Sequence, residues 1–321
     1  MKSIHTYTAK LCLLCTLCMV SQQFVFSQTD LDAIMLKKNI FCVGGMVSSN
    51  TWTDYWEGTF KRDNENLGKV TTNMYAAMGN YGLTDKLNVL FSLPYVTTKS
   101  SAGTLAGTNG FQDLSLMLKW MPYQVRLGSK NRLSLLGVGK ISLPVNNYVA
   151  DFLPMSIGMR SKTAGVRILV DFQRSKFFAT ASGAYTYRAN IDIDRNSYYT
   201  TEMHYTNEVE MPNVTGYNLR TGYRSKSWIA EAVLENMTTL GGFDIRKNDM
   251  PFPSNKMNMT QAGVNFKHTT KVVRGLEFTG GARYVISGRN VGQATTVYGG
   301  IFYLMDLAAK RKLRTNQSQQ P

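Results

Sequence analysis

Single charged side chains recur inside apolar stretches of this chain, and they are the residues best placed to do chemistry. In AGVRILVDF, residues 164–172, Arg167 and Asp171 are four positions apart. Side chains of an extended strand alternate between its two faces, so both charges point the same way and the apolar side chains point the other way. Opposite charges confined on one face should pair, because an unpaired charge in a closed space is costly. Such a face either lines a polar passage or fills it with a structural ladder of ion pairs.

The N-terminus must be interpreted before the composition. Residues 1–27 have the arrangement of a secretory signal peptide: a basic start, the apolar run LCLLCTLCMV at 11–20, and a cleavage site at Val25-Phe26-Ser27. The apolar run is too short to span a bilayer. Three of the four cysteines lie in this segment, so Cys42 alone remains and no intramolecular disulfide can form. The sequence therefore predicts an exported chain that is not held together by disulfides.

The mature chain stays basic. Removing Lys2 and Lys10 from the 36 Lys and Arg residues leaves 34 against 21 Asp and Glu, a net charge of +13. In an exported protein this balance favours an acidic membrane surface or a charged interior and argues against nucleic acid. No later stretch approaches the ~18 consecutive apolar residues that a second membrane helix would need.

Alternation at period two predicts an all-β protein. Strands in soluble sheets have about 5 or 6 residues, whereas a tilted strand that crosses a bilayer needs roughly 9 to 11. About twelve segments of the longer kind are expected, near 40–52, 68–82, 87–98, 111–121, 132–143, 162–173, 176–194, 213–224, 227–240, 256–267, 275–288 and 294–305. Short connections alternate with long ones near 53–67, 99–110, 144–161, 195–212 and 241–255. The predicted fold is a transmembrane antiparallel up-and-down β-barrel of the outer membrane of a Gram-negative bacterium.

This interpretation divides the chain into a signal peptide at 1–27, a short periplasmic segment at 28–39, the barrel at 40–305 and a basic periplasmic tail at 306–321. The N-terminal segment is long enough for one short turn inside or below the pore and too short for a folded plug domain. Nine charged residues on the polar strand faces are expected to line the lumen: Lys119, Lys140, Arg167, Asp171, Arg188, Arg220, Glu231, Glu235 and Arg283. Aromatic residues near strand ends, such as Trp120, Tyr148, Trp228 and Tyr284, are expected to form interfacial girdles.

Three stretches carry a family resemblance: NYGLTDKLNVLFSLPYV at 80–96, GFQDLSLMLKW at 110–120 and LGVGKISLPV at 136–145. They resemble outer-membrane transporters of the phenol meta-cleavage degradation pathway, which likewise pair a Y-G-L-T-D turn with a strand ending in L-P-Y. The likeness covers nearly the whole mature chain in layout. It implies a β-barrel that passes small hydrophobic or aromatic compounds, and it supplies no functional residues. The tail AAKRKLRTNQSQQP departs from the many barrels that end on an aromatic residue.

The sequence offers little for catalysis. After signal removal the histidines are His204 and His268. His204 lies near Glu202, Glu208 and Glu210 in a predicted loop, a set that could gather a divalent cation or simply be solvated. No G-x-S-x-G occurs, and GVGK at 137–140 lacks the upstream glycine and the Ser/Thr of a phosphate loop. We therefore expect no enzymatic activity, no cofactor and no metal.

Two functions remain in view. The first is a passive channel for small hydrophobic or amphipathic compounds, aromatic ones included, with outer-membrane lipid and lipopolysaccharide as surroundings. The second is a structural or adhesive surface barrel with a plugged lumen. The stretch TWTDYWEGTF at 51–60 bears on the second, because Trp52, Tyr55, Trp56 and Phe60 form a candidate external rim. Exposed aromatic residues often mark a binding surface, and the alternative is that they fold over the barrel mouth.

Overall fold

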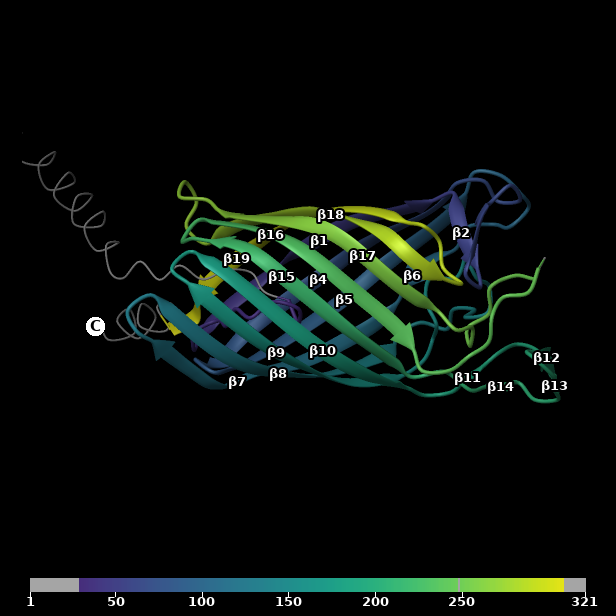
Figure 1. The fold of residues 1–321 in the computed structure, drawn as a ribbon, viewed down its shortest axis with the longest axis horizontal. Coiled ribbons are helices and arrows are strands. Elements are labelled where there is room, and N and C mark those ends of the chain that lie inside the picture. Colours follow the sequence, from purple (N-terminus) through teal and green to yellow (C-terminus); the bar gives the residue numbers. More distant parts are fainter. Residues whose placement is uncertain (1–28, 248, 309–321) are drawn as a thin grey trace, which may run out of the picture.

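The chain forms a closed antiparallel barrel of twelve long strands (Figure 1). The structure, a computed structural model, describes residues 29–247 and 249–308. The barrel strands are β1 (Ile40–Trp52), β4 (Val70–Thr84), β5 (Leu87–Ser100), β7 (Asp113–Leu127), β8 (Asn131–Pro144), β9 (Thr163–Arg174), β10 (Phe177–Arg188), β15 (Val214–Arg224), β16 (Trp228–Thr239), β17 (Asn258–Thr269), β18 (Leu276–Arg289) and β19 (Thr295–Asp306). Each pairs with its sequence neighbours, and β1 closes the ring against β19. Closure leaves no long strand with an unpaired edge, as a barrel in lipid requires.

The predicted fold class is confirmed, and most strand bounds agree within two residues. Two strands differ more. Strand β7 continues to Leu127, beyond an irregularity in its pairing with β8 between Trp120 and Tyr123. Strand β10 ends at Arg188, although alternation continues in the sequence to Asp194. There the chain leaves the barrel, and Ile191 enters a buried cluster among the loops. An alternation of apolar and polar residues shows that every second side chain is buried. It does not show whether lipid or a loop buries it.

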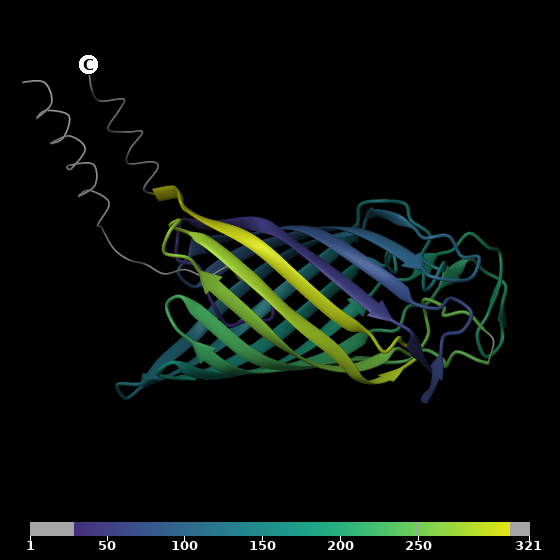
Figure 2. The same ribbon diagram turned by 90° about the horizontal axis from the view of Figure 1, so that it is seen from above.

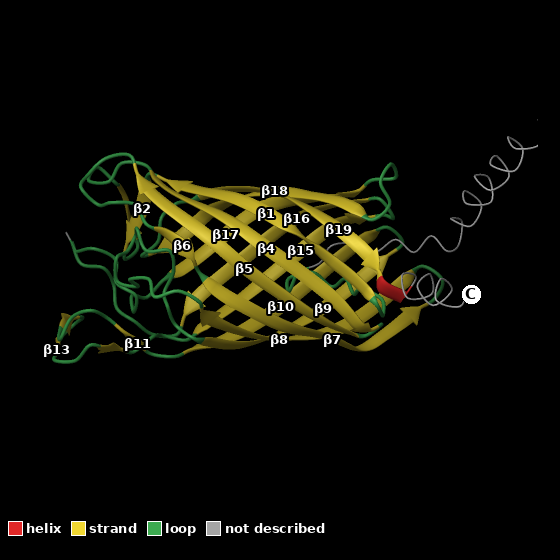
Figure 3. Ribbon diagram, turned by 180° about the vertical axis from the view of Figure 1, so that it is seen from behind, coloured by secondary structure: helices red, strands yellow, loops and turns green. Residues whose placement is uncertain are grey.

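The two ends of the barrel differ (Figure 3). At one end, here called the turn end, the strands are joined by short connections, as at 85–86, 175–176 and 225–227. The other, the loop end, carries five long connections. They contain the short strands β2 (Asp54–Glu57), β3 (Phe60–Asp63), β6 (Asn109–Phe111), β11 (Ile191–Asp192), β12 (Tyr198–Tyr199), β13 (Met203–His204) and β14 (Glu208–Val209).

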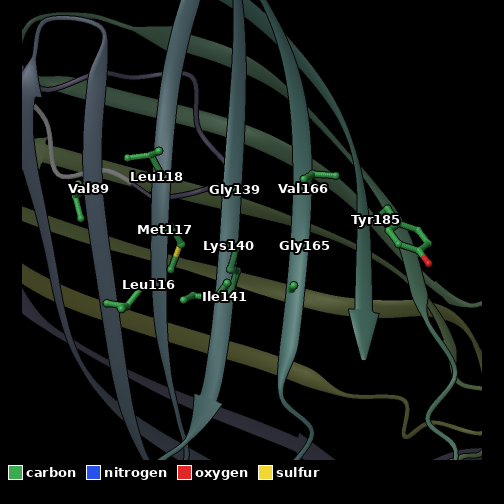
Figure 4. A pocket seen from close by; sticks show the side chains of 11 residues that line it. Val89, Leu116, Met117, Leu118, Gly139, Lys140, Ile141, Gly165, Val166 and Tyr185 are labelled. Carbon is green, nitrogen blue, oxygen red and sulfur yellow. The ribbon is translucent and has the colours of Figure 1, made fainter. Parts of the chain in front are cut away.

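The outer wall is apolar. On β9, the outward side chains of Val166 and Ile168 are each 62% exposed, whereas the inward side chain of the next residue, Leu169, is fully buried. A shallow groove of about 550 Å³ crosses the outer wall over β5 and β7 to β10, where Leu116, Leu118 and Val166 contribute apolar walls (Figure 4). Hydrophobic side chains so exposed would be unfavourable in water and are the expected contact with lipid.

The girdle prediction holds only in part. Trp120, Trp228 and Tyr284 are about half exposed on the outer wall, at 54%, 52% and 46%. Tyr148 instead belongs to the connection after β8, where it is buried against Val96 of β5 and its hydroxyl donates to Asp113 at 2.6 Å. The predicted signal peptide, residue 28 and nearly all of the predicted basic tail, 309–321, lie outside the described residues. Within the described part of the chain, no helix is long and apolar enough to cross a membrane.

Candidate functional site

The segment of residues 29–39, here called the N-terminal segment, lies inside the barrel at the turn end (Figure 2). Neighbouring residues contact different parts of the wall. Ala33 packs in a cluster with inward side chains of β5, β7, β8 and β9, and Ile34 packs against β10 and β16. Leu36 is fully buried against β1 and β19. The segment therefore crosses the lumen, and it does so in turns and extended chain without forming a helix.

Lys119 of β7 holds this segment in place. Its Nζ donates to the carbonyl oxygens of Thr29, Asp32 and Ile34 at 2.5, 2.8 and 3.2 Å. It also pairs with the Asp32 carboxylate at 3.1 Å, and the Lys119 side chain is fully buried. A buried ammonium is stable only when its donors are satisfied and its charge is balanced. The sequence placed Lys119 on the lumen face but did not identify Asp32 as its partner.

Asp32 is kept ionised by this arrangement. Burial alone would raise the pKa of its carboxyl, but the charges of Lys119 and Lys267, together with the amide of Thr29, outweigh burial and hold the pKa well below its usual range. A carboxyl whose pKa falls on folding stabilises the folded form above its ordinary pKa. That contribution disappears only as the pH falls through the lowered value, so the Lys119–Asp32 pair should hold the segment throughout the neutral range.

Gly82 of β4 lies against the backbone of the N-terminal segment. A Cβ added there would stand inside van der Waals contact with the Lys37 carbonyl group, whereas one added at Gly137 on the outer wall would meet nothing within 4 Å. Gly82→Ala should therefore displace the segment, at a cost of about 1–3 kcal/mol typical of overpacking. Displacement of the segment can be detected at Cys42, because the side chain of this residue is buried against Leu36.

The measurement is the rate at which a water-soluble maleimide labels Cys42 in the folded mature protein. Gly82→Ala should label faster than the wild type, and Gly137→Ala should label at the wild-type rate. Equal protection of Cys42 in all three proteins would show that the wall tolerates the added methyl and that the segment stays docked.

The loop end of the lumen is covered by the connection between β8 and β9, residues 145–162. Met155 is fully buried, and its carbonyl oxygen accepts from the hydroxyl of Thr98 at 2.7 Å and from that of Thr108. Ile157 packs against Val96 on the inward face of β5. This loop is thus fixed to the barrel by buried contacts at the mouth.

A charged network lies between these two coverings. Arg220 of β15 pairs with Glu231 of β16 at 2.7 Å, with both side chains less than 10% exposed. Asn265 of β17 donates to Glu231 and accepts from Arg283 of β18 at 2.6 Å. Tyr298 of β19 donates to the same Asn265 oxygen. Five consecutive strands are linked by one network, so this side of the lumen is a ladder of satisfied charges.

All nine charged residues that the sequence predicted for the lumen lie on the inward faces of their strands, but their partners differ. Asp171 is buried, accepts from Thr180 at 2.6 Å and pairs with Arg224 at 3.4 Å. Arg283 and Glu235 are 3.9 Å apart. Arg167 is half-buried and donates to Ser182 at 2.9 Å. Lys140 and Arg188 are also half-buried. The opposite charges at Arg167 and Asp171 therefore share a face without pairing with each other.

The predicted rim aromatics lie at the loop end with unequal exposure. Trp56 is 8% exposed and packs with Val285 and Ala294, and Trp52 packs beside it. Phe60 is 64% exposed, with the Arg62 guanidinium 5.1 Å from its ring centre. Both tryptophans thus fold over the barrel mouth, which leaves Phe60 as the most exposed of the group.

His204, the candidate metal ligand, is engaged in other contacts. Its ring stacks on Tyr198 with centroids 4.8 Å apart, and Nε2 is 2.8 Å from the Thr200 hydroxyl. Among the described residues, no three His, Cys, Asp or Glu side chains gather as they would around a metal ion.

Comparison with solved structures places the fold. An outer membrane channel of Pseudomonas putida matches over 87% of this chain and 99% of its own, with 16% sequence identity and a TM-score of 0.69. That match shows the fold of an outer-membrane channel. No family model matches the chain, and no curated protein matches it in sequence.

Two further barrels are similar at lower scores. The translocator domain of the autotransporter NalP from Neisseria meningitidis has 10% identity and a TM-score of 0.43, over 85% of this chain and 90% of its own. CymD, a monoaromatic hydrocarbon channel, has 11% identity and a TM-score of 0.36, over 84% and 88%. At these scores the two barrels carry no argument about the present chain.

Proposed function

We propose that this protein is a passive channel of the outer membrane for small hydrophobic or amphipathic compounds, aromatic ones included, with its turn end in the periplasm. One observation carries the proposal. Inward side chains around the N-terminal segment are completely buried, as at Lys119 and Asn88, whereas those at mid-height, such as Arg167 and Glu235, are still half-exposed. Half-exposed inward charges support a water-accessible chamber in the lumen. The chain itself covers this chamber at both ends, with the N-terminal segment at the turn end and the loop at 145–162 at the loop end.

The walls of this chamber suit a permeant with both polar and apolar parts. Arg220, Glu231 and Arg283 belong to the charged network on β15 to β19. On the opposite side, the inward side chains of Met117 and Leu136 are buried in the apolar cluster around Ala33, so they would face a permeant once the N-terminal segment leaves. A polar wall facing an apolar wall is the usual chemistry of a small-molecule path.

The first test is single-channel conductance of the purified mature chain in a planar bilayer, with Arg167→Ala beside the wild type. Arg167 makes one hydrogen bond to a neutral hydroxyl, so its removal should cost about 1 kcal/mol of stability or less. The loss of a half-exposed positive charge should shift ion selectivity toward cations. Openings that do not change with Arg167→Ala would place the conducting path elsewhere.

A plugged structural or adhesive barrel remains the second candidate function, favoured by the coverings at both ends. Silence in the bilayer from a correctly folded, heat-modifiable barrel would support it. Phe60→Ala would then test adhesion, because Phe60 is the most exposed of the rim aromatics whereas Trp52 and Trp56 are packed into the mouth.

A further inference from the structure

The turn end carries a large cavity beneath the N-terminal segment, here called the vestibule. Its volume is about 1430 Å³. Its charged walls come from five turns and strand ends and from the N-terminal segment. The cations that line it are Lys37, Arg132, Lys176, Arg224, Lys226 and Lys271, and the single carboxylate among its lining residues is Asp85. A concave surface with six cations and one anion concentrates negatively charged ligands.

Two of these cations are incompletely neutralised, the buried Arg224 and the half-buried Arg132. Arg224 is 8% exposed, and its contact with Asp171 is long, at 3.4 Å to each carboxylate oxygen. The Nε atoms of Arg224 and Arg132 are both buried without a hydrogen-bond partner. Asp171 is the carboxylate that pairs with Arg224, whereas Arg132 donates to the neutral side-chain oxygen of Gln173 at 2.5 Å. A buried guanidinium with an unused donor is costly unless a ligand or a further group completes its bonding.

The vestibule also has an apolar roof. Ala33, Ile34 and Met35 of the N-terminal segment line it, together with Met121 of β7. Arg224 itself lies over the ring of Phe178 at 4.0 Å, so this guanidinium is held against a buried aromatic side chain. An inorganic anion would use the cations and leave this roof unused. A small carboxylate with a hydrocarbon or aromatic body would use both surfaces.

We propose that the vestibule is a binding site for small organic carboxylates with an apolar body, with Arg224 and Arg132 holding the carboxylate and residues 33–35 covering the body. The proposal that these carboxylates are permeants rests on the proposed channel function, because the vestibule is the last chamber on a path through the turn end. The proposal that they bind in the vestibule does not require the barrel to conduct.

The test is isothermal titration calorimetry, in which benzoate is titrated into the full mature chain in a non-ionic detergent. The heat of titrating benzoate into detergent alone is subtracted. Benzyl alcohol is the neutral counterpart, and inorganic phosphate is the anion without an apolar body. Benzoate should bind, and both comparison compounds should bind much more weakly. Arg224→Gln should weaken benzoate binding about tenfold or more, the loss expected for one charge-assisted hydrogen bond, and Arg224→Lys should restore part of it.

Two controls keep the result interpretable. Lys61→Gln removes a cation at the loop end and should leave benzoate binding unchanged. Lys176→Gln removes an exposed vestibule cation whose Nζ lies 5.7 Å from the ring centre of Tyr223, a contact worth about 1 kcal/mol or less at an exposed site. It should weaken binding and reduce its salt dependence even if Arg224→Gln fails to give a heat-modifiable barrel.

Several outcomes would overturn the assignment: no benzoate binding by the wild type, equal binding by wild type and both vestibule variants, or phosphate binding as tight as benzoate binding. A polyglutamate peptide that binds more tightly and displaces benzoate would reassign the vestibule to an acidic protein segment. A silent barrel that binds benzoate would refute the channel and keep the site, whereas a conducting barrel that binds no benzoate would refute the site alone.

Discussion

Replacing Lys119 by methionine should release the N-terminal segment from the lumen and raise single-channel conductance. The substitution keeps an unbranched side chain of similar length but removes the charge and all four contacts of Nζ with the segment. Asp32 would be left as a buried carboxylate without its cation, which typically costs about 3–5 kcal/mol. The segment has an alternative to bearing that cost, because it can undock and return Asp32 to water.

Undocking limits how much of the cost appears as lost barrel stability. In the docked state, the apolar contacts of Ala33, Ile34 and Leu36 with the wall are unaffected by the substitution, and they oppose undocking once Lys119 is gone. The expected result is therefore local: rapid maleimide labelling of Cys42 and larger openings, with a smaller change in the unfolding of the strands. Asp32→Asn introduced into Lys119→Met should restore part of the docking, because it removes the unpaired buried charge that drives the segment out.

Lys140→Met is the matched control. Lys140 also points inward, from the neighbouring strand β8, but it is half-exposed and lies outside the contacts of the N-terminal segment. Its replacement should alter ion selectivity and leave Cys42 protected. If Lys119→Met left both conductance and Cys42 labelling at wild-type values, the segment would be neither held by Lys119 nor obstructing the lumen.

The barrel could be predicted from the sequence because its strands obey a local rule. Lipid buries every second side chain, so Val166 and Ile168 on one face and Arg167 on the other are assigned by alternation alone. The same rule misassigned Ile191, because a loop cluster can bury a side chain as lipid does. The same rule also places Arg224 on the inward face, because it lies four residues after Arg220 on the same strand. The inward position of Arg224 could therefore have been predicted from the sequence.

Partners and occupants of the lumen could not be predicted in this way. Asp171 pairs with Arg224, which is 53 positions away in the chain, and Lys119 binds a segment 87 positions before it. Residues 29–39 have no periodicity that marks a docked segment, and their place depends on contacts with nine strands. Pair formation follows from barrel closure and register, which bring distant positions to the same height.

Removing Arg220 should be the most destabilising single change on the charged wall, and it separates a structural ladder from a permeation path. Arg220→Met leaves the Glu231 carboxylate buried with Asn265 as its donor, and we expect a loss of about 3–5 kcal/mol in the free energy of unfolding. The measurement is a urea titration of the mature chain in lipid vesicles, followed by the heat-modifiable gel shift. Arg167→Ala, with its single bond to Ser182, is the comparison and should lose about 1 kcal/mol or less.

The double variant Arg220→Met/Glu231→Met decides what the pair is for. Two well-packed apolar side chains often replace a buried ion pair with little loss, so most of the stability should return. If conductance and selectivity also remain at wild-type values, the Arg220–Glu231 pair serves the fold and permeants pass along another wall. If stability returns while selectivity changes, the same charges that join β15 to β16 also face the permeating ions. A double variant as unstable as Arg220→Met alone would contradict the assumption that the pair can be replaced by packing, and would assign the stability of this wall to the wider network through Asn265 and Arg283.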